Sequence, residues 1–94
     1  MATVVFSGAA LRGIEHFLGT ATAGCRASRA VVLRSAAALL ASHPLAGAAL
    51  ERGLRQLVIG HGATGAMAVY RFAIAADEVR VLVVAGQREL GYRP

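Results

Sequence analysis

The sequence contains no lysine, so all ten of its basic residues are arginines. It has only five acidic residues, which leaves a formal net charge of +5. Arginine keeps its charge at any working pH and presents a planar fork to phosphates and carboxylates. A small basic domain of this kind favours an acidic partner, either a nucleic acid or an acidic protein segment. The alternative is a solvated basic surface without a partner.

Cysteine and long apolar runs are also scarce. The single cysteine, Cys25, excludes an internal disulfide and fits a reducing compartment. The longest apolar run, Ala36–Ala41, is far shorter than the roughly 20 residues that a membrane span needs. The N-terminus does not have the pattern of a signal peptide. We therefore expect a cytoplasmic protein with no membrane partner, folded as one domain over residues 1–94.

Residues that ligate metals or transfer protons form no recognisable motif. His16, His43 and His61 do not stand at metal-site spacings from one another or from Cys25. The five carboxylates are scattered along the chain and give no convincing pair. The sequence therefore predicts no metal and no cofactor.

The segment Gly60–Gly65 reads GHGATG and matches the GxGxxG pattern of dinucleotide-binding loops. That pattern also needs a helix at its third glycine and an acidic residue about 20 positions later. Here the next residues, AMAVYRF, resemble a strand, and Asp77 comes too early. A glycine-rich hairpin loop is the favoured interpretation. A helix over Ala66–Ala76 would restore the dinucleotide interpretation.

Three apolar runs in the second half of the chain predict an antiparallel meander. Leu54–Ile59, Ala66–Ile74 and Val79–Ala85 are rich in Val, Ile, Tyr and Phe, and Gly or Asp/Glu clusters separate them. Val4–Phe6 is a plausible first strand, expected at an edge of the sheet.

The alternation of side chains along these strands predicts two faces. One side of the middle run carries Ala68, Tyr70 and Phe72, and the other carries Met67, Val69 and Arg71. In the last run, Val79, Val81, Val83 and Ala85 oppose Arg80, Leu82 and Val84. Neither face is strongly polar. One face must meet helices, and the other is a half-apolar surface with arginines, where a partner could bind.

Two helices are predicted upstream of the meander. Ser7 is placed to cap the first, in which Gly13 costs up to about 1 kcal/mol relative to alanine. The second is expected over Arg26–Ala41, and Pro44 ends it. Its arginines, Arg26, Arg29 and Arg34, are expected to project away from its apolar stripe.

The predicted fold is therefore α+β in the order β-α-α-β-β-β, with a helical hairpin packed on one face of an antiparallel sheet. In the connection after the second helix, Leu45 and Leu50 are the only large apolar residues. We expect them to cover the edge of the sheet.

Four segments together resemble the ParE branch of the RelE/ParE toxin superfamily. They are His43-Pro44-Leu45 with Gly47, Gly53–Ile59, Val69–Phe72 and Gln87–Tyr92, and they span nearly the whole chain in the right order. The resemblance implies the same fold, a helical hairpin against an antiparallel sheet. It also implies a toxin of a type II toxin–antitoxin operon, held inactive in a hetero-oligomer by a small antitoxin with an acidic C-terminal segment.

The resemblance implies two targets. ParE-like toxins poison DNA gyrase, whereas RelE-like toxins cleave messenger RNA in the ribosome with basic residues on two strands and an arginine and a tyrosine near the C-terminus. Arg88 and Tyr92 could match that last pair, although the spacing of Tyr92 differs. Met67 occupies the arginine position of the third strand, and no lysine supplies the other cations. Gyrase poisoning without catalytic residues therefore ranks first, messenger RNA cleavage second, and a non-toxic nucleic-acid-binding module third.

The residues expected to contact partners follow from this interpretation. Arg71, Arg88 and Tyr92 are predicted to engage the cellular target. Arg55, Met67 and Val69 are predicted to contact the antitoxin. The alternative is that Arg71 and Arg80 pair with Asp77, Glu78 or Glu89 and merely keep the sheet soluble.

Overall fold

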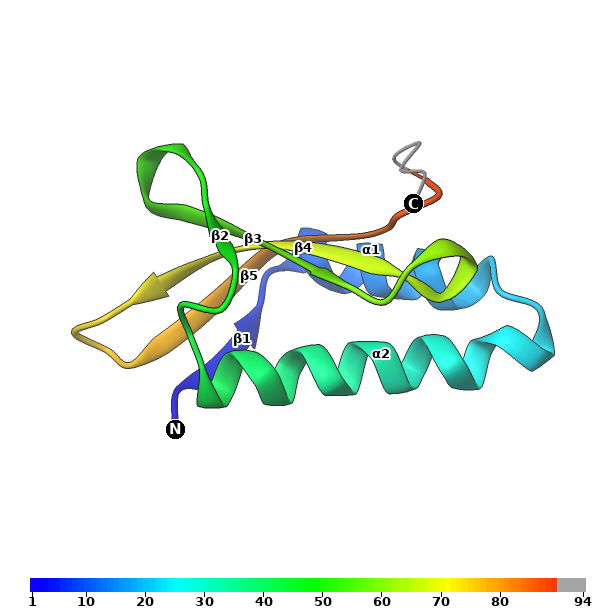
Figure 1. The fold of residues 1–94 in the computed structure, drawn as a ribbon, viewed down its shortest axis with the longest axis horizontal. Coiled ribbons are helices and arrows are strands. Elements are labelled where there is room, and N and C mark those ends of the chain that lie inside the picture. Colours follow the sequence, from blue (N-terminus) through cyan, green and yellow to red (C-terminus); the bar gives the residue numbers. More distant parts are fainter. Residues whose placement is uncertain (90–94) are drawn as a thin grey trace.

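The computed structural model describes residues 1–89, which form two α-helices and five strands. The helices are α1 (Gly8–Gly19) and α2 (Ala23–Ser42). The strands are β1 (Thr3–Phe6), β2 (Ala48–Ala49), β3 (Leu54–Ile59), β4 (Ala66–Ala73) and β5 (Glu78–Gly86), with short 3-10 turns η1 (Glu51–Gly53) and η2 (Gly62–Thr64). Both helices contribute to one hydrophobic core on one face of the sheet (Figure 1). The predicted α+β fold is confirmed, with β2 as an added short strand.

The sheet has the strand order β1-β5-β4-β3-β2. Strands β3, β4 and β5 form the predicted antiparallel meander, and β1 lies at an edge as expected. However, β1 runs parallel to β5, so the sheet is mixed rather than antiparallel throughout. The backbone N–H of Ala2 donates to the carbonyl of Ala41, which shows that α2 returns the chain to the end where β1 begins. Strand β3 starts from that end, and after two hairpin reversals β5 runs in the direction of β1.

A β-bulge in β5 changes which side chains face the core. Val69 of β4 pairs with Val83, but the next residue of β4, Tyr70, pairs with Val81, which leaves Leu82 without a partner. The extra residue reverses the alternation beyond it. Val83 is therefore 44% exposed and Val84 only 6%. The prediction that Val83 shares a face with Val81 is wrong for this reason.

Helix α1 begins at its predicted cap and packs unusually close to β5. The Oγ of Ser7 accepts from the Ala10 N–H and donates to the carbonyl of Leu82, both at 3.0 Å. One hydroxyl thus caps the helix and provides a hydrogen bond to the Leu82 carbonyl at the bulge. A Cβ built on Gly13 would lie 2.0 Å from the carbonyl oxygen of Val84. Glycine at this position lets the helix backbone approach the strand backbone directly.

Helix α2 is longer than predicted, and few of its side chains are buried against the sheet. It starts at Ala23, after the N-cap Thr22, and ends two residues before Pro44. Its buried residues are Ala36 and Leu40, and an apolar cavity of about 40 Å³ remains between α2 and the sheet. Over residues 1–89, neither helix combines the length and the apolar character that crossing a membrane requires.

The connection between α2 and β3 is fixed at its base, but its two leucines are exposed. The fully buried Tyr70 donates its hydroxyl hydrogen to the carbonyl of Pro44 at 2.8 Å and accepts from the Gly47 N–H at 2.9 Å. Leu45 and Leu50 are 59% and 43% exposed. The prediction that they cover the sheet edge is wrong, because the two-residue strand β2 pairs with that edge of β3 instead.

The GHGATG segment is a hairpin loop, as predicted. It joins the antiparallel strands β3 and β4, and the segment after it is a strand. Gly60 and Gly62 have φ values of 66° and 64°, in the region that favours glycine. The dinucleotide interpretation of this loop is therefore excluded by the fold around it.

The contact between α1 and β5 predicts an asymmetry between two glycines of the same helix. Gly13→Ala should lower the free energy of unfolding by about 1–3 kcal/mol, because the new methyl group must displace the Val84 carbonyl. Gly19→Ala is the matched control, since nothing lies within 4 Å of a Cβ there. It should leave stability unchanged or raise it by up to about 1 kcal/mol. Urea unfolding measures both, and equal effects would contradict the close approach.

Candidate functional site

No helix among residues 1–89 packs on the sheet face that points away from the core. Core residues of each strand alternate with residues on this opposite surface, which we call the open face. Its members include Val5, Leu54, Gln56, Val58, Met67, Val69, Arg71, Glu78, Arg80, Val83 and Ala85. Val5, Val58 and Val83 are 41%, 43% and 44% exposed. The half-apolar surface with arginines that the sequence predicts is therefore present.

The three residues predicted to contact an antitoxin do not share one surface. Met67 and Val69 lie on the open face, where the Nε2 of Gln56 donates to the Sδ of Met67. Arg55 lies on the helix side, and its Nη1 donates to the carbonyls of Gly47 at 2.8 Å and Leu45 at 3.3 Å. Arg55 therefore holds the connection between α2 and β3, while the other two contribute to the open face.

Arg71 and Arg88, both predicted to engage the target, lie at opposite ends of the sheet. Arg71 is exposed on β4 and pairs in register with Arg80, near the turn into β5. Arg88 is exposed just beyond Gly86, which pairs with Ala66 at the start of β4. Ala66 and Arg71 are five residue steps apart along β4, which corresponds to roughly 17 Å. A small ligand could not touch both arginines, whereas a large macromolecular surface could. Tyr92 lies outside the described residues.

The arginines at the β4–β5 turn differ in their ion pairing. The Nε of Arg80 lies 2.6 Å from the Oε1 of Glu78. This contact confirms, for Arg80, the alternative prediction that these arginines pair with nearby carboxylates. Among residues 1–89, Arg71 has no carboxylate within ion-pair distance. Like charges directly opposite each other on a sheet repel. Arg71 is therefore a cation whose charge the described part of the chain does not neutralise.

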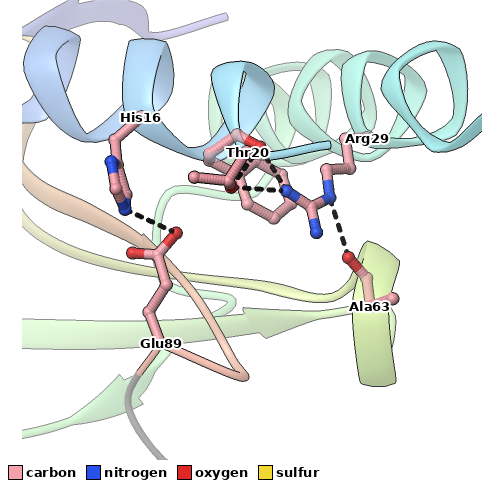
Figure 2. A network of polar contacts seen from close by, with 6 residues as sticks. His16, Thr20, Arg29, Ala63 and Glu89 are labelled. Carbon is pink, nitrogen blue, oxygen red and sulfur yellow. Dashed lines mark hydrogen bonds and ion pairs between the residues drawn. The ribbon is translucent and has the colours of Figure 1, made fainter. Parts of the chain in front are cut away.

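A hollow of about 290 Å³ lies at the other end of the sheet, between the end of α1, α2, η2 and the end of β5. We call it the terminal hollow. Its polar lining includes Thr20, Arg29, Arg88 and Glu89. Glu89 also reaches α1, where its Oε1 lies 3.8 Å from the Nε2 of His16 (Figure 2). The histidine side chain is 62% exposed, so this ion pair adds little stability.

The prediction that Arg29 projects away from the apolar stripe of α2 into solvent is wrong. Its Nε donates to the carbonyl of Ala63 at 2.8 Å, and its Nη1 donates to the Oγ1 of Thr20 at 3.0 Å and to the carbonyl of Phe17 (Figure 2). Its guanidinium carbon also lies 4.7 Å from the centroid of the Phe17 ring. One side chain thus joins α1, α2 and η2. The sequence carries no signal for this role, because two of the three acceptors are backbone carbonyls.

Gln87 is a second structural residue that the sequence does not reveal. It is 3% exposed, and its Nε2 donates to the carbonyls of Gly60 at 2.9 Å and Ile59 at 3.2 Å. A Cβ built on Gly65 would lie 2.5 Å from the Gln87 Cδ. The last glycine of GHGATG is therefore explained by the close packing of this amide against the hairpin loop.

The open face is better suited to binding than to proton transfer. Within residues 1–89, no three residues among His, Cys, Asp and Glu are grouped so that they could hold a metal ion. The charged side chains on the open face are Arg71, Arg80 and Glu78, and the carboxylate of Glu78 is engaged by Arg80. Arginine keeps its proton and does not serve as a general base. The open face can therefore attract carboxylates or phosphates.

The contacts of Arg29 predict that its guanidinium group, and not only its charge, stabilises the fold. Arg29→Lys should lower the free energy of unfolding by about 1–3 kcal/mol, because one ammonium cannot replace the planar donors and leaves acceptors unpaired. Arg34→Lys on the exposed side of the same helix is the control and should change stability by less than about 0.5 kcal/mol. Thermal unfolding measures both variants. Equal stabilities would refute the structural role of Arg29.

No protein-family model matches the sequence, and no curated protein matches it at a significant level. Solved structures do match. A chain of the intact E. coli RelBE toxin-antitoxin complex superposes with a TM-score of 0.61 at 16% identity, and the match covers 92% of this chain and 96% of that one. Because nearly all of both chains is included, the shared part is the whole architecture rather than one motif. The chain has a RelE-like fold, as the sequence resemblance implied, and its assignment to the ParE branch stays a prediction.

Proposed function

We propose that this chain is the toxin of a type II toxin–antitoxin pair. The observation that carries the proposal is the match over 92% of this chain to a chain of a toxin–antitoxin complex. The net charge of +5 and the apolar open face support the proposal. An acidic antitoxin segment would neutralise the positive charge and cover the apolar surface. The active chain would then be the free form, and the hetero-oligomer with antitoxin the inactive one.

The antitoxin is proposed to bind across the open face. Met67 and Val69 lie near its centre, with the exposed side chains of Val58 and Val83 on the neighbouring strands. Burial of these aliphatic groups supplies affinity, and pairing of carboxylates with Arg71 supplies orientation. Arg55 contributes indirectly, since it holds the connection beside β3.

DNA gyrase is the proposed target. Cleavage of RNA needs a general base and groups that stabilise the phosphate. Met67 stands at the arginine position of the RelE-like pattern, and the chain has no lysine to supply the remaining cations. Inhibition by binding does not need these groups. This reasoning favours a gyrase poison in which Arg88, Tyr92 and Arg71 contact a large surface.

Ribosome-dependent cleavage of messenger RNA is the second candidate. Arg88 lines the terminal hollow together with Glu89, and Glu89 lies 3.8 Å from His16. Arg88 would supply a cation for a phosphate bound in the hollow, and the Glu89 carboxylate would be the group available there as a general base. A non-toxic nucleic-acid-binding module is the third candidate, and only the net charge of +5 supports it.

Expression experiments separate these candidates. Production of the chain should arrest growth, and co-production of the small gene product encoded next to it should restore growth. For a gyrase poison, plasmid DNA from arrested cells should contain cleaved gyrase complexes while message lengths stay unchanged. Shortened messages together with intact plasmid DNA would contradict gyrase as the target and support cleavage of messenger RNA in the ribosome. Normal growth at a verified level of soluble protein would refute the toxin proposal.

Arg88 is predicted to contribute to toxicity without contributing to stability. Arg88→Ala should weaken target binding roughly tenfold, as the loss of an interface arginine commonly does. Its melting temperature should be unchanged, because Arg88 is exposed. Arg34→Ala, an exposed arginine on α2, is the control and should stay toxic. Growth assays and thermal melting of Arg88→Ala and Tyr92→Ala give the answer, and full toxicity in both variants would exclude this surface.

A further inference from the structure

Three exposed aliphatic residues meet at the end of the sheet where β4 turns into β5. Leu45, Leu50 and Ile74 are 59%, 43% and 79% exposed. All three line one hollow of about 210 Å³, which Phe72 and Leu54 also border. We call these three residues the aliphatic patch. They come from two segments, the connection between α2 and β3 and the β4–β5 turn, which the fold brings together.

The patch is displayed by a connection that the core holds in place. The buried hydroxyl of Tyr70 bridges Pro44 and Gly47, and the Leu50 N–H donates to the Leu54 carbonyl at 2.8 Å. A Cβ built on Gly47 would lie 2.8 Å from the Tyr70 ring, so the backbone at Gly47 packs directly against that ring. The leucines therefore point outward because of fixed contacts on the other side of the connection. Exposed aliphatic clusters on an ordered scaffold are typical of protein interfaces.

The charged residues around the patch leave a small excess of positive charge, with Arg71 as the cation that no described carboxylate neutralises. Arg55 lines the hollow, Arg71 pairs in register with Leu54, and Arg52 is exposed in η1. The fourth cation, Arg80, is paired with Glu78, and the remaining carboxylates at this end are Glu51 and Asp77. Four arginines thus face three carboxylates. A carboxylate brought by a partner would also reduce the repulsion between Arg71 and Arg80.

We infer that the aliphatic patch is a docking site for an acidic segment of the antitoxin. The inference rests on the proposed toxin–antitoxin function and extends it to a surface that the open face does not include. One bulky aliphatic or aromatic side chain of the segment fills the hollow between Leu45, Leu50 and Ile74, and a neighbouring carboxylate pairs with Arg71. Arg71 is the next residue after Val69 on the open face of β4, so one antitoxin segment can run from the open face onto the patch.

Glutamine substitutions test the patch without disturbing the core. The double variant Leu45→Gln/Leu50→Gln and the single variant Ile74→Gln should each bind the product of the adjoining small gene at least roughly tenfold more weakly in calorimetric titration. Leu39→Gln is the matched control, because Leu39 is a leucine on α2 that is 39% exposed and does not line the hollow. Its affinity should stay within about twofold of the wild type. Melting temperatures of all variants should match the wild type, since each side chain is exposed.

The outcomes separate this inference from the function on which it rests. If the wild type binds the gene product and the patch variants bind equally tightly, the docking site is refuted and the toxin–antitoxin proposal stands. If the wild type does not bind it and growth is not restored, the proposed function fails, and the inference fails with it. Sedimentation of the isolated chain tests a third case. A wild-type dimer that the Leu45→Gln/Leu50→Gln variant abolishes would assign the patch to a second copy and overturn the antitoxin assignment.

Discussion

The direct contact between the backbones of α1 and β5 is the constraint on which the rest of this fold depends. It requires a glycine at position 13 and a strand whose Val84 carbonyl faces the helix. The β-bulge at Leu82 provides that orientation, and the hydroxyl of Ser7 joins the bulge to the start of the helix. With α1 held this close, Phe17 is 1% exposed. The buried ring then forms the surface against which Arg29 closes the terminal hollow.

The two faces of the sheet use their polar groups differently. On the helix side, Tyr70, Arg55, Gln87 and Arg29 each donate to backbone carbonyls and fix a connection. On the open face, the side chains are mostly aliphatic, and Arg71 has no carboxylate partner within residues 1–89. The net charge therefore overstates the number of arginines that a partner can reach. Arginines that hold connections in place contribute to binding only through the shape they maintain.

Much of the architecture could be predicted from composition and spacing. The strand runs, the cap at Ser7 and the hairpin around Gly60–Gly65 depend on local preferences, and these were confirmed. The direction of β1 and the reversal of faces after Val81 were not predictable, because each depends on contacts between distant segments. A bulge has no signature in a run such as VLVVA, whose residues suit either face. Gly13 shows the same limit. From the sequence it is only a residue that destabilises a helix, whereas the structure needs it for the close packing of α1 on β5.

The functional residues were predicted less completely than the fold. Met67, Val69 and Arg71 lie on one exposed surface, but Arg55 serves the opposite side and Arg88 lies at the far end of the sheet. Alternation along a strand gives relative faces within that strand, and only the register between strands decides which faces coincide. The roles of Arg29 and Gln87 depend on carbonyl groups, which every residue carries. Sequence patterns therefore do not identify them.

The edge position of β1 has a consequence for the order in which the chain folds. Its strand neighbour, β5, is nearly the whole described chain away, and the hydrogen bond between Ser7 and Leu82 joins positions 75 residues apart. Pairings of such high contact order carry a large loop-closure entropy and form slowly. During synthesis, the helices can form early, but the strand surface that they cover is missing until β5 has been translated. A partner that recognises the open face or the aliphatic patch consequently meets its complete binding surface only after β5 has been synthesised.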